Sequence, residues 1–242
     1  MDNQGCFNDI QLFLIKIWSA RKALIKFQPL LSRLLNIKED FHVHTSYNDH
    51  SALDLNIASA VNYAEAIGLK TLAFTEHVRR ESNWIDSYVN EIEKISTNSN
   101  LKLITGFEAK ILKDGSIDCL PKYSGNYFVI ASFHTIYGNK EIWMNAIKNV
   151  IQNPDVNVIG HLAPEQSFSL HNEELIEICE LLREHGKIIE LNAKYNRPPL
   201  DWVLKFKEHN VEFHLGSDAH SLHEIGEFSR IRKLVQVVNS ES

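Results

Sequence analysis

The chain has few cysteines, and none of them is placed to form a framework. Cys6, Cys119 and Cys179 are far apart in the 242 residues, and no pair has the Cys-x-x-Cys spacing. This argues against a disulfide-stabilised fold and against a thiolate zinc site. We therefore expect a reducing, cytoplasmic environment.

Long hydrophobic runs are also missing. The most apolar stretch near the start, Ile10 to Trp18, is interrupted by Lys16, and no small-residue cleavage site follows it. It is also much shorter than the ~20 residues that a membrane-spanning helix requires. We predict neither a signal peptide nor a membrane span.

A basic stripe and two common catalytic motifs are absent as well. The formal net charge is −6, which argues against nucleic acid as a partner. The chain has no Gly-x-Ser-x-Gly elbow and no phosphate-cradling glycine loop, so serine-nucleophile and P-loop chemistry are disfavoured. A small or anionic substrate held by local charges is the remaining expectation.

From about residue 40, apolar strand-like runs alternate with helical patterns. Residues 54–66 predict a helix, 71–75 a buried strand, 101–106 a further strand, and 225–238 a closing helix. We count about seven strands and no internal repeat. Such alternation predicts parallel strands joined by helices, in a single α/β barrel domain over residues 39–242.

Residues 1–38 follow a different pattern. Apolar residues recur there at helical spacing, and Pro29 marks a break between two helices. Several lysines and arginines make this segment basic. We predict an N-terminal helical extension that packs on the barrel and is a candidate surface for a homo-oligomer. A membrane-surface or partner-binding helix is the alternative.

Most of the predicted strands end at a histidine or a carboxylate. His42 and His44 are two residues apart in a strand, so they point to the same face. The carboxyl ends of all strands in a parallel barrel converge on one rim. We expect that rim to gather His42, His44, His77, Glu108, His134, His161, Asp218 and His220, with His50 in the loop after the first strand.

Such a ring of polar groups predicts bound metal. Each unsatisfied buried group would cost about a few kcal/mol, and divalent cations remove that cost. Imidazole and carboxylate ligands without thiolate suit zinc, iron or manganese. Nine ligands are too many for one ion, so two to three are predicted, with Glu108 well suited to bridge a pair.

The motifs resemble, in order and spacing, those of the polymerase and histidinol phosphatase (PHP) family of metal-dependent phosphoesterases. They are His42-x-His44, Thr75-Glu76-His77, Gly106-Phe107-Glu108, Ser132-Phe133-His134, Gly160-His161 and Gly216-Ser217-Asp218-Ala219-His220. The resemblance covers about residues 40 to 230 and implies a distorted (β/α)7 TIM-like barrel with a trinuclear metal site. Glu76 and Leu162 depart from the family, which often has Asp and Pro at these places.

The resemblance also implies a ligand set. The first ion would be held by His42, His44, Glu108 and Asp218. The second would be held by Glu108, which bridges, with His134 and His161. The third would be held by His50, His77 and His220. The residues expected to act in catalysis are Glu108, Asp218 and His220.

The implied activity is hydrolysis of a small phosphate monoester by a hydroxide that bridges two metal ions. Histidinol phosphate is the best single substrate, because Glu76 resembles the histidinol phosphatase branch. Cationic side chains commonly assist phosphate binding, and the candidates are Arg197 first, then Lys194, Arg79 and Arg80.

Two alternatives stay open. One is a phosphodiesterase or nuclease acting on nucleic-acid or nucleotide substrates, against which the acidic net charge counts. The other is a non-catalytic metal-binding module, against which the complete ligand set counts.

Overall fold

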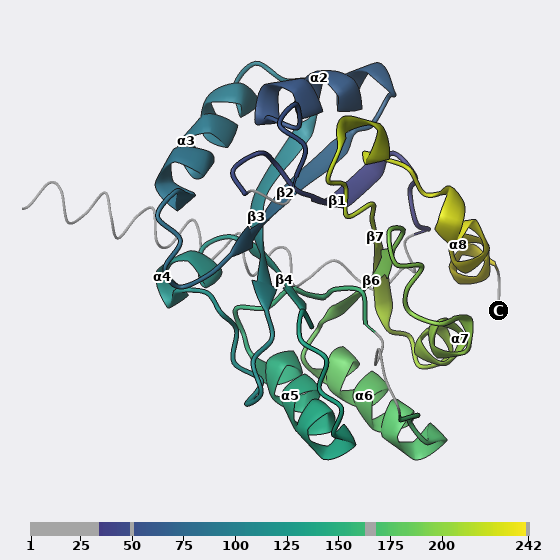
Figure 1. Ribbon diagram of the computed structural model, residues 1–242. Coiled ribbons are helices and arrows are strands. Elements are labelled where there is room, and N and C mark those ends of the chain that lie inside the picture. The colour runs from purple at the N-terminus through teal and green to yellow at the C-terminus, as the bar shows by residue number, and fades with distance from the viewer. Residues whose placement is uncertain (1–33, 49–50, 163–167, 241–242) are drawn as a thin grey trace, which may run out of the picture. The chain divides into compact units, whose positions relative to one another are not determined.

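The computed structural model describes residues 34–48, 51–162 and 168–240. These residues contain a seven-stranded parallel sheet in which each strand pairs with the next along the chain (Figure 1). The strands are β1 (Glu39–Val43), β2 (Thr71–Val78), β3 (Lys102–Lys110), β4 (Phe128–Ser132), β5 (Val158–Ile159), β6 (Ile188–Asn192) and β7 (Glu212–Gly216). Residues 1–33 of the predicted N-terminal extension lie outside the described residues.

The first and last strands meet, so the sheet nearly closes into a barrel. Val43 forms a parallel bridge with Ala219. The His44 amide donates to the Ala219 carbonyl at 3.0 Å, and the Asp218 amide donates to the His42 carbonyl at 2.8 Å. The predicted distorted (β/α)7 TIM-like barrel is confirmed.

Helices follow the strands on the outside of this barrel (Figure 1). They are α2 (Ile57–Ala66), α3 (Ile85–Ser96), the short α4 (Pro121–Ser124), α5 (Lys140–Gln152), α6 (Asn172–Glu184), α7 (Leu200–Glu208) and α8 (Arg232–Asn239). The helix expected over 54–66 begins later because the Asn56 side chain caps it, accepting from the Ser59 amide at 2.9 Å. Within the described residues no helix has the length and apolarity that crossing a membrane requires.

The closing helix is shorter than the sequence predicts. Leu222–Glu224 and Ser229–Ile231 form 3₁₀ turns, and the α-helix begins only at Arg232. Gly226 interrupts the pattern with a left-handed backbone (φ 71°), and its amide donates to Asp40 Oδ2 at 2.9 Å. The prediction of one helix over 225–238 was therefore wrong in its first half.

Alternation along β3 separates the outer core from the barrel interior. Phe107 packs toward α3, with its ring centroid 5.8 Å from that of Tyr88. Glu108, the next residue, therefore points to the opposite face. Strand β3 also runs past the predicted end at Gly106, because Glu108 still pairs with His77 on one side and Ile130 on the other.

The amino-terminal side of the barrel interior is filled by a small layer of rings. Phe41 of β1 stacks on His214 of β7 at 5.1 Å between centroids, and both contact Phe128 of β4. Because β1 and β4 are not neighbours in the sheet, these rings meet across the interior. The layer closes the barrel beneath the histidines.

Candidate metal centre

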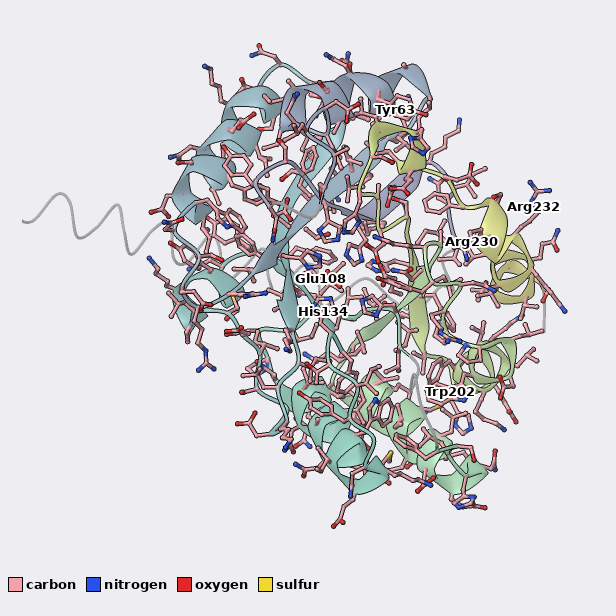
Figure 2. The ribbon with its side chains drawn as sticks, viewed as in Figure 1. Tyr63, Glu108, His134, Trp202, Arg230 and Arg232 are labelled. Atoms are coloured by element: carbon pink, nitrogen blue, oxygen red, sulfur yellow. The ribbon has the colours of Figure 1, made fainter. Side chains whose placement is uncertain are left out.

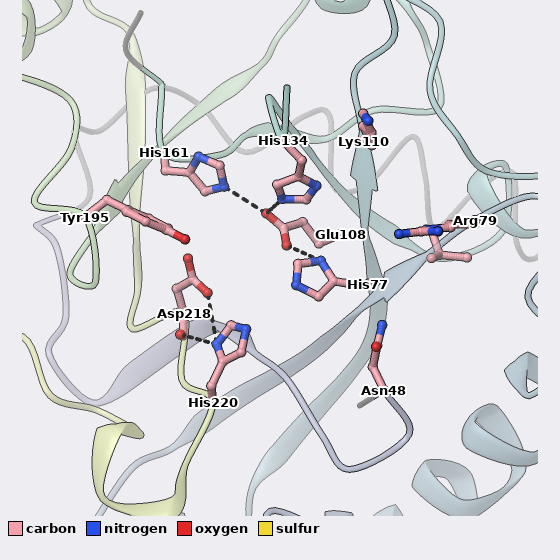
Figure 3. A pocket seen from close by; sticks show the side chains of 11 residues that line it. Asn48, His77, Arg79, Glu108, Lys110, His134, His161, Tyr195, Asp218 and His220 are labelled. Atoms are coloured by element: carbon pink, nitrogen blue, oxygen red, sulfur yellow. Dashed lines mark hydrogen bonds and ion pairs between the residues drawn. The ribbon is translucent and has the colours of Figure 1, made fainter. Parts of the chain in front are cut away.

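Glu108 lies at the centre of the histidine cluster and is 1% exposed (Figures 2 and 3). Its Oε1 is 3.1 Å from Nε2 of both His134 and His161, and its Oε2 is 2.9 Å from Nδ1 of His77. Counting contacts up to 3.6 Å, its carboxylate faces ring nitrogens of His42, His44, His77, His134 and His161. One carboxylate thus joins side chains from five strands or the turns that follow them.

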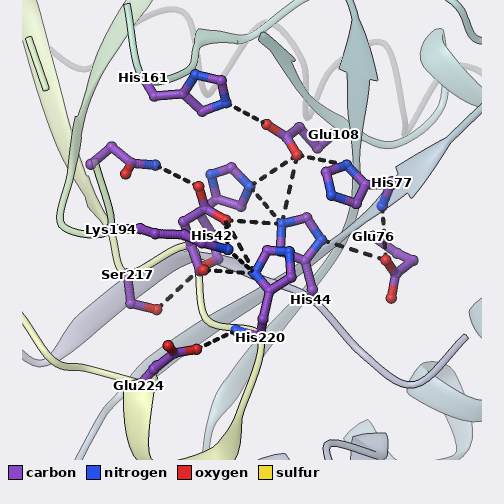
Figure 4. A network of polar contacts seen from close by, with 12 residues as sticks. His42, His44, Glu76, His77, Glu108, His161, Lys194, Ser217, His220 and Glu224 are labelled. Atoms are coloured by element: carbon purple, nitrogen blue, oxygen red, sulfur yellow. Dashed lines mark hydrogen bonds and ion pairs between the residues drawn. The ribbon is translucent and has the colours of Figure 1, made fainter. Parts of the chain in front are cut away.

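Asp218 forms a second focus of the cluster, in contact with His44, Lys194 and His220, which are labelled in Figure 4. Its Oδ1 lies 3.2 Å from His44 Nε2, 3.4 Å from His220 Nδ1 and 3.8 Å from Lys194 Nζ. The Lys194 ammonium is also 2.7 Å from His220 Nδ1. Lys194, one of the predicted substrate cations, therefore lies directly beside two predicted ligands.

The backbone bends to bring two of these side chains inward. His161 and Asp218 have positive φ values of 26° and 56°, which non-glycine residues seldom adopt. Both follow the last residue of a strand by two positions. Such conformations are retained where the surrounding structure determines them, which is common at functional sites.

Glu190 of β6 supports the cluster from behind. It is fully buried, and its Oε1 accepts from His42 Nδ1 at 2.6 Å while its Oε2 accepts from the His161 amide at 2.8 Å. Gly216 leaves space for it, because a Cβ there would collide with Glu190 Oε1 and lie 2.8 Å from the Cβ of His42. Asn192 extends the support by donating to both Glu190 and Asp218.

Glu76 has the matching role for His44. Its Oε1 is 3.4 Å from His44 Nδ1. Its Oε2 accepts from the Thr45 amide at 2.7 Å and from the Thr45 hydroxyl at 2.5 Å. His42 of β1 and His44 of the turn after it therefore each have a buried carboxylate on the Nδ1 side and direct Nε2 toward the cluster.

This arrangement fits divalent cations. His42 Nε2 and His44 Nε2 are 3.1 Å apart, and when both Nδ1 atoms donate to their carboxylates, two lone pairs face each other. A cation resolves that conflict, and a carboxylate on the far side of a metal-binding histidine is a common supporting contact. Three sets have ligand atoms within 4.8 Å of one another: His42, His44 and Glu108; His44, His77 and His220; and His77, Glu108 and His134.

The electrostatics of the cluster without metal favour charged carboxylates. Burial raises the pKa of Glu108, but the His134, His42 and His77 imidazoles outweigh it and hold that pKa well below its usual range. Burial lowers the pKa of His44, yet the Asp218 and Glu76 carboxylates raise it to about 9. Metal binding must therefore displace protons.

In the metal-free protein, these pKa shifts should make the free energy of unfolding depend on pH. A histidine whose pKa is raised on folding stabilises fully below its unfolded value near 6.5 and loses that contribution as pH rises through the folded value. For His44 this amounts to about 3 kcal/mol lost between pH 6.5 and 9. We expect urea unfolding of the chelator-treated protein to show a falling free energy over this window, and a flat profile would contradict the assigned contacts.

A cavity of about 420 Å³ opens onto the cluster (Figure 3). It is lined by Asn48, His77, Val78, Arg79, Glu108, Lys110, His134, His161, Tyr195, Asp218 and His220. Of the predicted substrate cations, Arg79 lines it. Arg80 and Arg197 do not: Arg80 Nη2 donates to the Ile117 carbonyl at 3.3 Å, and the Arg197 backbone pairs with Asn192.

The structure thus brings together eight of the nine predicted ligands, and His50 lies outside the described residues. Sequence reasoning missed Glu190 and Lys110. Glu190 carries a detectable signal, since it is the single carboxylate in the apolar run 188–191. Lys110 stands two residues after Glu108, and it is found only when β3 is extended beyond the end that the sequence suggested.

Comparisons with known proteins agree with this architecture. A family model described as "PHP domain" matches residues 40–194. A protein of Acetivibrio thermocellus named "Probable phosphatase" is 28% identical over 214 residues, which cover 83% of this chain and 86% of that protein. A Vibrio parahaemolyticus protein, also named a "Probable phosphatase", is 29% identical over 224 residues, covering 86% of this chain and 87% of that protein.

A solved structure shares the fold. The crystal structure of the "putative histidinol phosphatase hisK" of Listeria monocytogenes superposes with a TM-score of 0.63 at 17% identity. The superposition covers 78% of this chain and 97% of that one. At this identity the likeness concerns the fold alone.

Proposed function

The chain belongs to the PHP domain family, and from that premise we propose that it is a phosphatase hydrolysing a small phosphate monoester, histidinol phosphate or a similar metabolite. Water and the ester would yield an alcohol and inorganic phosphate. The relatives named "Probable phosphatase" support this class of reaction. The proposal places the activity in the barrel, residues 39–242, and treats residues 1–38 as a separate extension.

One observation carries the proposal. Five imidazoles, from four strands or their following turns, converge on the buried carboxylate of Glu108, and this cluster faces a cavity of about 420 Å³. A purely structural polar core has no need of an open cavity beside it. A site of this size suits a small substrate.

The donor set suits two to three ions of zinc, iron or manganese. When bound, adjacent divalent ions act as Lewis acids and lower the pKa of a shared water. Glu190 and Glu76 would hold the His42 and His44 rings in the tautomer that presents Nε2. Lys194 would supply positive charge beside Asp218 for the phosphate oxygens.

The first test compares substrates on purified, metal-analysed protein. We expect two to three equivalents of metal and faster turnover of histidinol phosphate or para-nitrophenyl phosphate than of the diester bis-para-nitrophenyl phosphate. His134→Ala and Asp218→Asn should each lower metal content and reduce kcat by about a hundredfold or more. The exposed His185→Ala is the control and should change neither.

Two results would contradict the proposal. Preference for the diester would indicate a phosphodiesterase or nuclease. Absence of turnover at full metal occupancy, for every ester tried, would indicate a metal-binding module.

A further inference from the structure

Two cationic side chains, Arg79 and Lys110, follow predicted ligands in the sequence and lie at the cavity. His77 pairs with Glu108 across β2 and β3. Arg79 and Lys110 each follow one of these ligands by two positions, so they lie on the same face, about 6–7 Å further along the strands. Both line the cavity, and Figure 3 shows them across His77 and Glu108 from Asp218.

These cations have no partner within the described part of the chain. Neither the Arg79 guanidinium nor the Lys110 ammonium makes an ion pair or side-chain hydrogen bond with any described residue, whereas Lys194 contacts Asp218 and His220. Arg79 is exposed and Lys110 half-buried. Although the chain has a net charge of −6, no carboxylate of the described residues pairs with these two positive charges at the cavity.

The acidic groups of the cavity are already engaged. Among the described residues that line it, the only carboxylates are Glu108 and Asp218, and both belong to the histidine cluster. A leaving group that carries an ammonium would therefore meet two positive charges and no free carboxylate. A leaving group that carries a negative charge would meet complementary partners.

We propose that Arg79 and Lys110 form a subsite for a second anionic group, so that the substrate is a phosphate monoester whose alcohol part carries a carboxylate or another phosphate. This inference rests on the proposed phosphatase function and narrows its substrate class. The cations start one strand repeat, about 6–7 Å, beyond the predicted ligands, so the second anionic group should be joined to the phosphate by a short chain. Histidinol phosphate, with a cationic leaving group, fits this subsite poorly.

Binding tests the subsite independently of turnover. Calorimetry on the metal-loaded protein would compare three non-hydrolysed phosphonates of similar length: propylphosphonate, 3-phosphonopropionate and propane-1,3-bisphosphonate. We expect one or both of the doubly anionic probes to bind about tenfold more tightly than propylphosphonate. The carboxylate and bisphosphonate arms show which second group is preferred.

The variants assign the effect to these residues. Arg79→Gln combined with Lys110→Gln should abolish the preference, so that the three probes bind equally. Lys102→Gln removes the same charge from the exposed opposite end of β3 and should keep the full preference. Equal binding of the probes to the unaltered protein, or a preference that survives in the double variant, would overturn the inference.

Kinetics separate this inference from the function on which it rests. 3-Phosphoglycerate has a carboxylate where glycerol 3-phosphate has a hydroxymethyl group, and we expect kcat/KM to be about tenfold higher for the former, mainly through KM. Turnover of both esters without that preference, or faster turnover of histidinol phosphate, would overturn the anionic subsite while leaving a phosphatase. Failure of every ester would overturn the phosphatase, and the phosphonate titration would still decide the subsite.

Discussion

Glu108→Gln should remove activity by about a thousandfold in kcat and leave the protein with less bound metal. Glutamine has nearly the same shape, so packing beside Phe107 and Ala109 is preserved. Its amide has no negative charge to hold the surrounding imidazoles and their ions, and its NH₂ group cannot serve as a ligand to a cation. Metal analysis and single-turnover assays on the same preparation would measure both effects.

The matched control for this change is Glu93→Gln, which removes the same charge from the exposed face of α3. It should retain the metal content and kcat of the unaltered protein. If Glu108→Gln also retained both, Glu108 would not be the bridging centre of the site.

Glu190→Ala is expected to weaken metal binding by about 10- to 100-fold although Glu190 is not a predicted ligand. Without its carboxylate, His42 Nδ1 and the His161 amide both lose a buried acceptor. We also expect the free energy of unfolding of the metal-free protein to fall by about 3 kcal/mol, because a buried charged contact is broken by removing one partner. Chelator competition measures the first effect and urea unfolding the second.

Two further variants, Glu190→Gln and Glu212→Ala, test whether the loss of metal affinity comes from removing the Glu190 carboxylate. The glutamine keeps one acceptor oxygen and should give an intermediate loss of metal affinity, whereas a residue that only fills space would show no difference between glutamine and glutamate. Glu212, exposed at the start of β7, is a control on the neighbouring strand, and its alanine variant should be unchanged. An unaltered metal affinity in Glu190→Ala would show that His42 needs no support.

Sequence patterns predicted the barrel well because its strands are buried runs bounded by helices. These patterns failed where the backbone conformation of a single residue determines where a helix begins. The left-handed Gly226, whose amide donates to Asp40 of the first strand, delays the start of the closing helix to Arg232. That contact joins residues from opposite ends of the barrel sequence, and local periodicity contains no information about it.

The candidate site also contains residues that the sequence patterns could predict and residues that they could not. The clustering of the predicted ligands at strand ends was predictable because parallel strands converge on one rim. The supporting residues were not, since the role of Glu190 depends on the space left by Gly216 and on the position of His42 in another strand. Arg80 and Arg197 illustrate the opposite error: Arg80 follows His77 closely and Arg197 follows the sixth strand, but neither lines the cavity, and Arg80 donates to the Ile117 carbonyl instead.

The meeting of β1 and β7 has a consequence for how the protein is made. His42 and His44 belong to the first strand and the turn after it, while Asp218 and His220 follow the last, and backbone hydrogen bonds between these segments complete the barrel. All residues from His42 to His220 must be synthesised before the two halves of this predicted ligand set can meet. Metal captured there would then stabilise only completed molecules, by mass action on the folded form. Chains that end before β7, or in which β7 does not pair with β1, would not assemble this cluster. They would gain neither the bound ions nor the activity that depends on them.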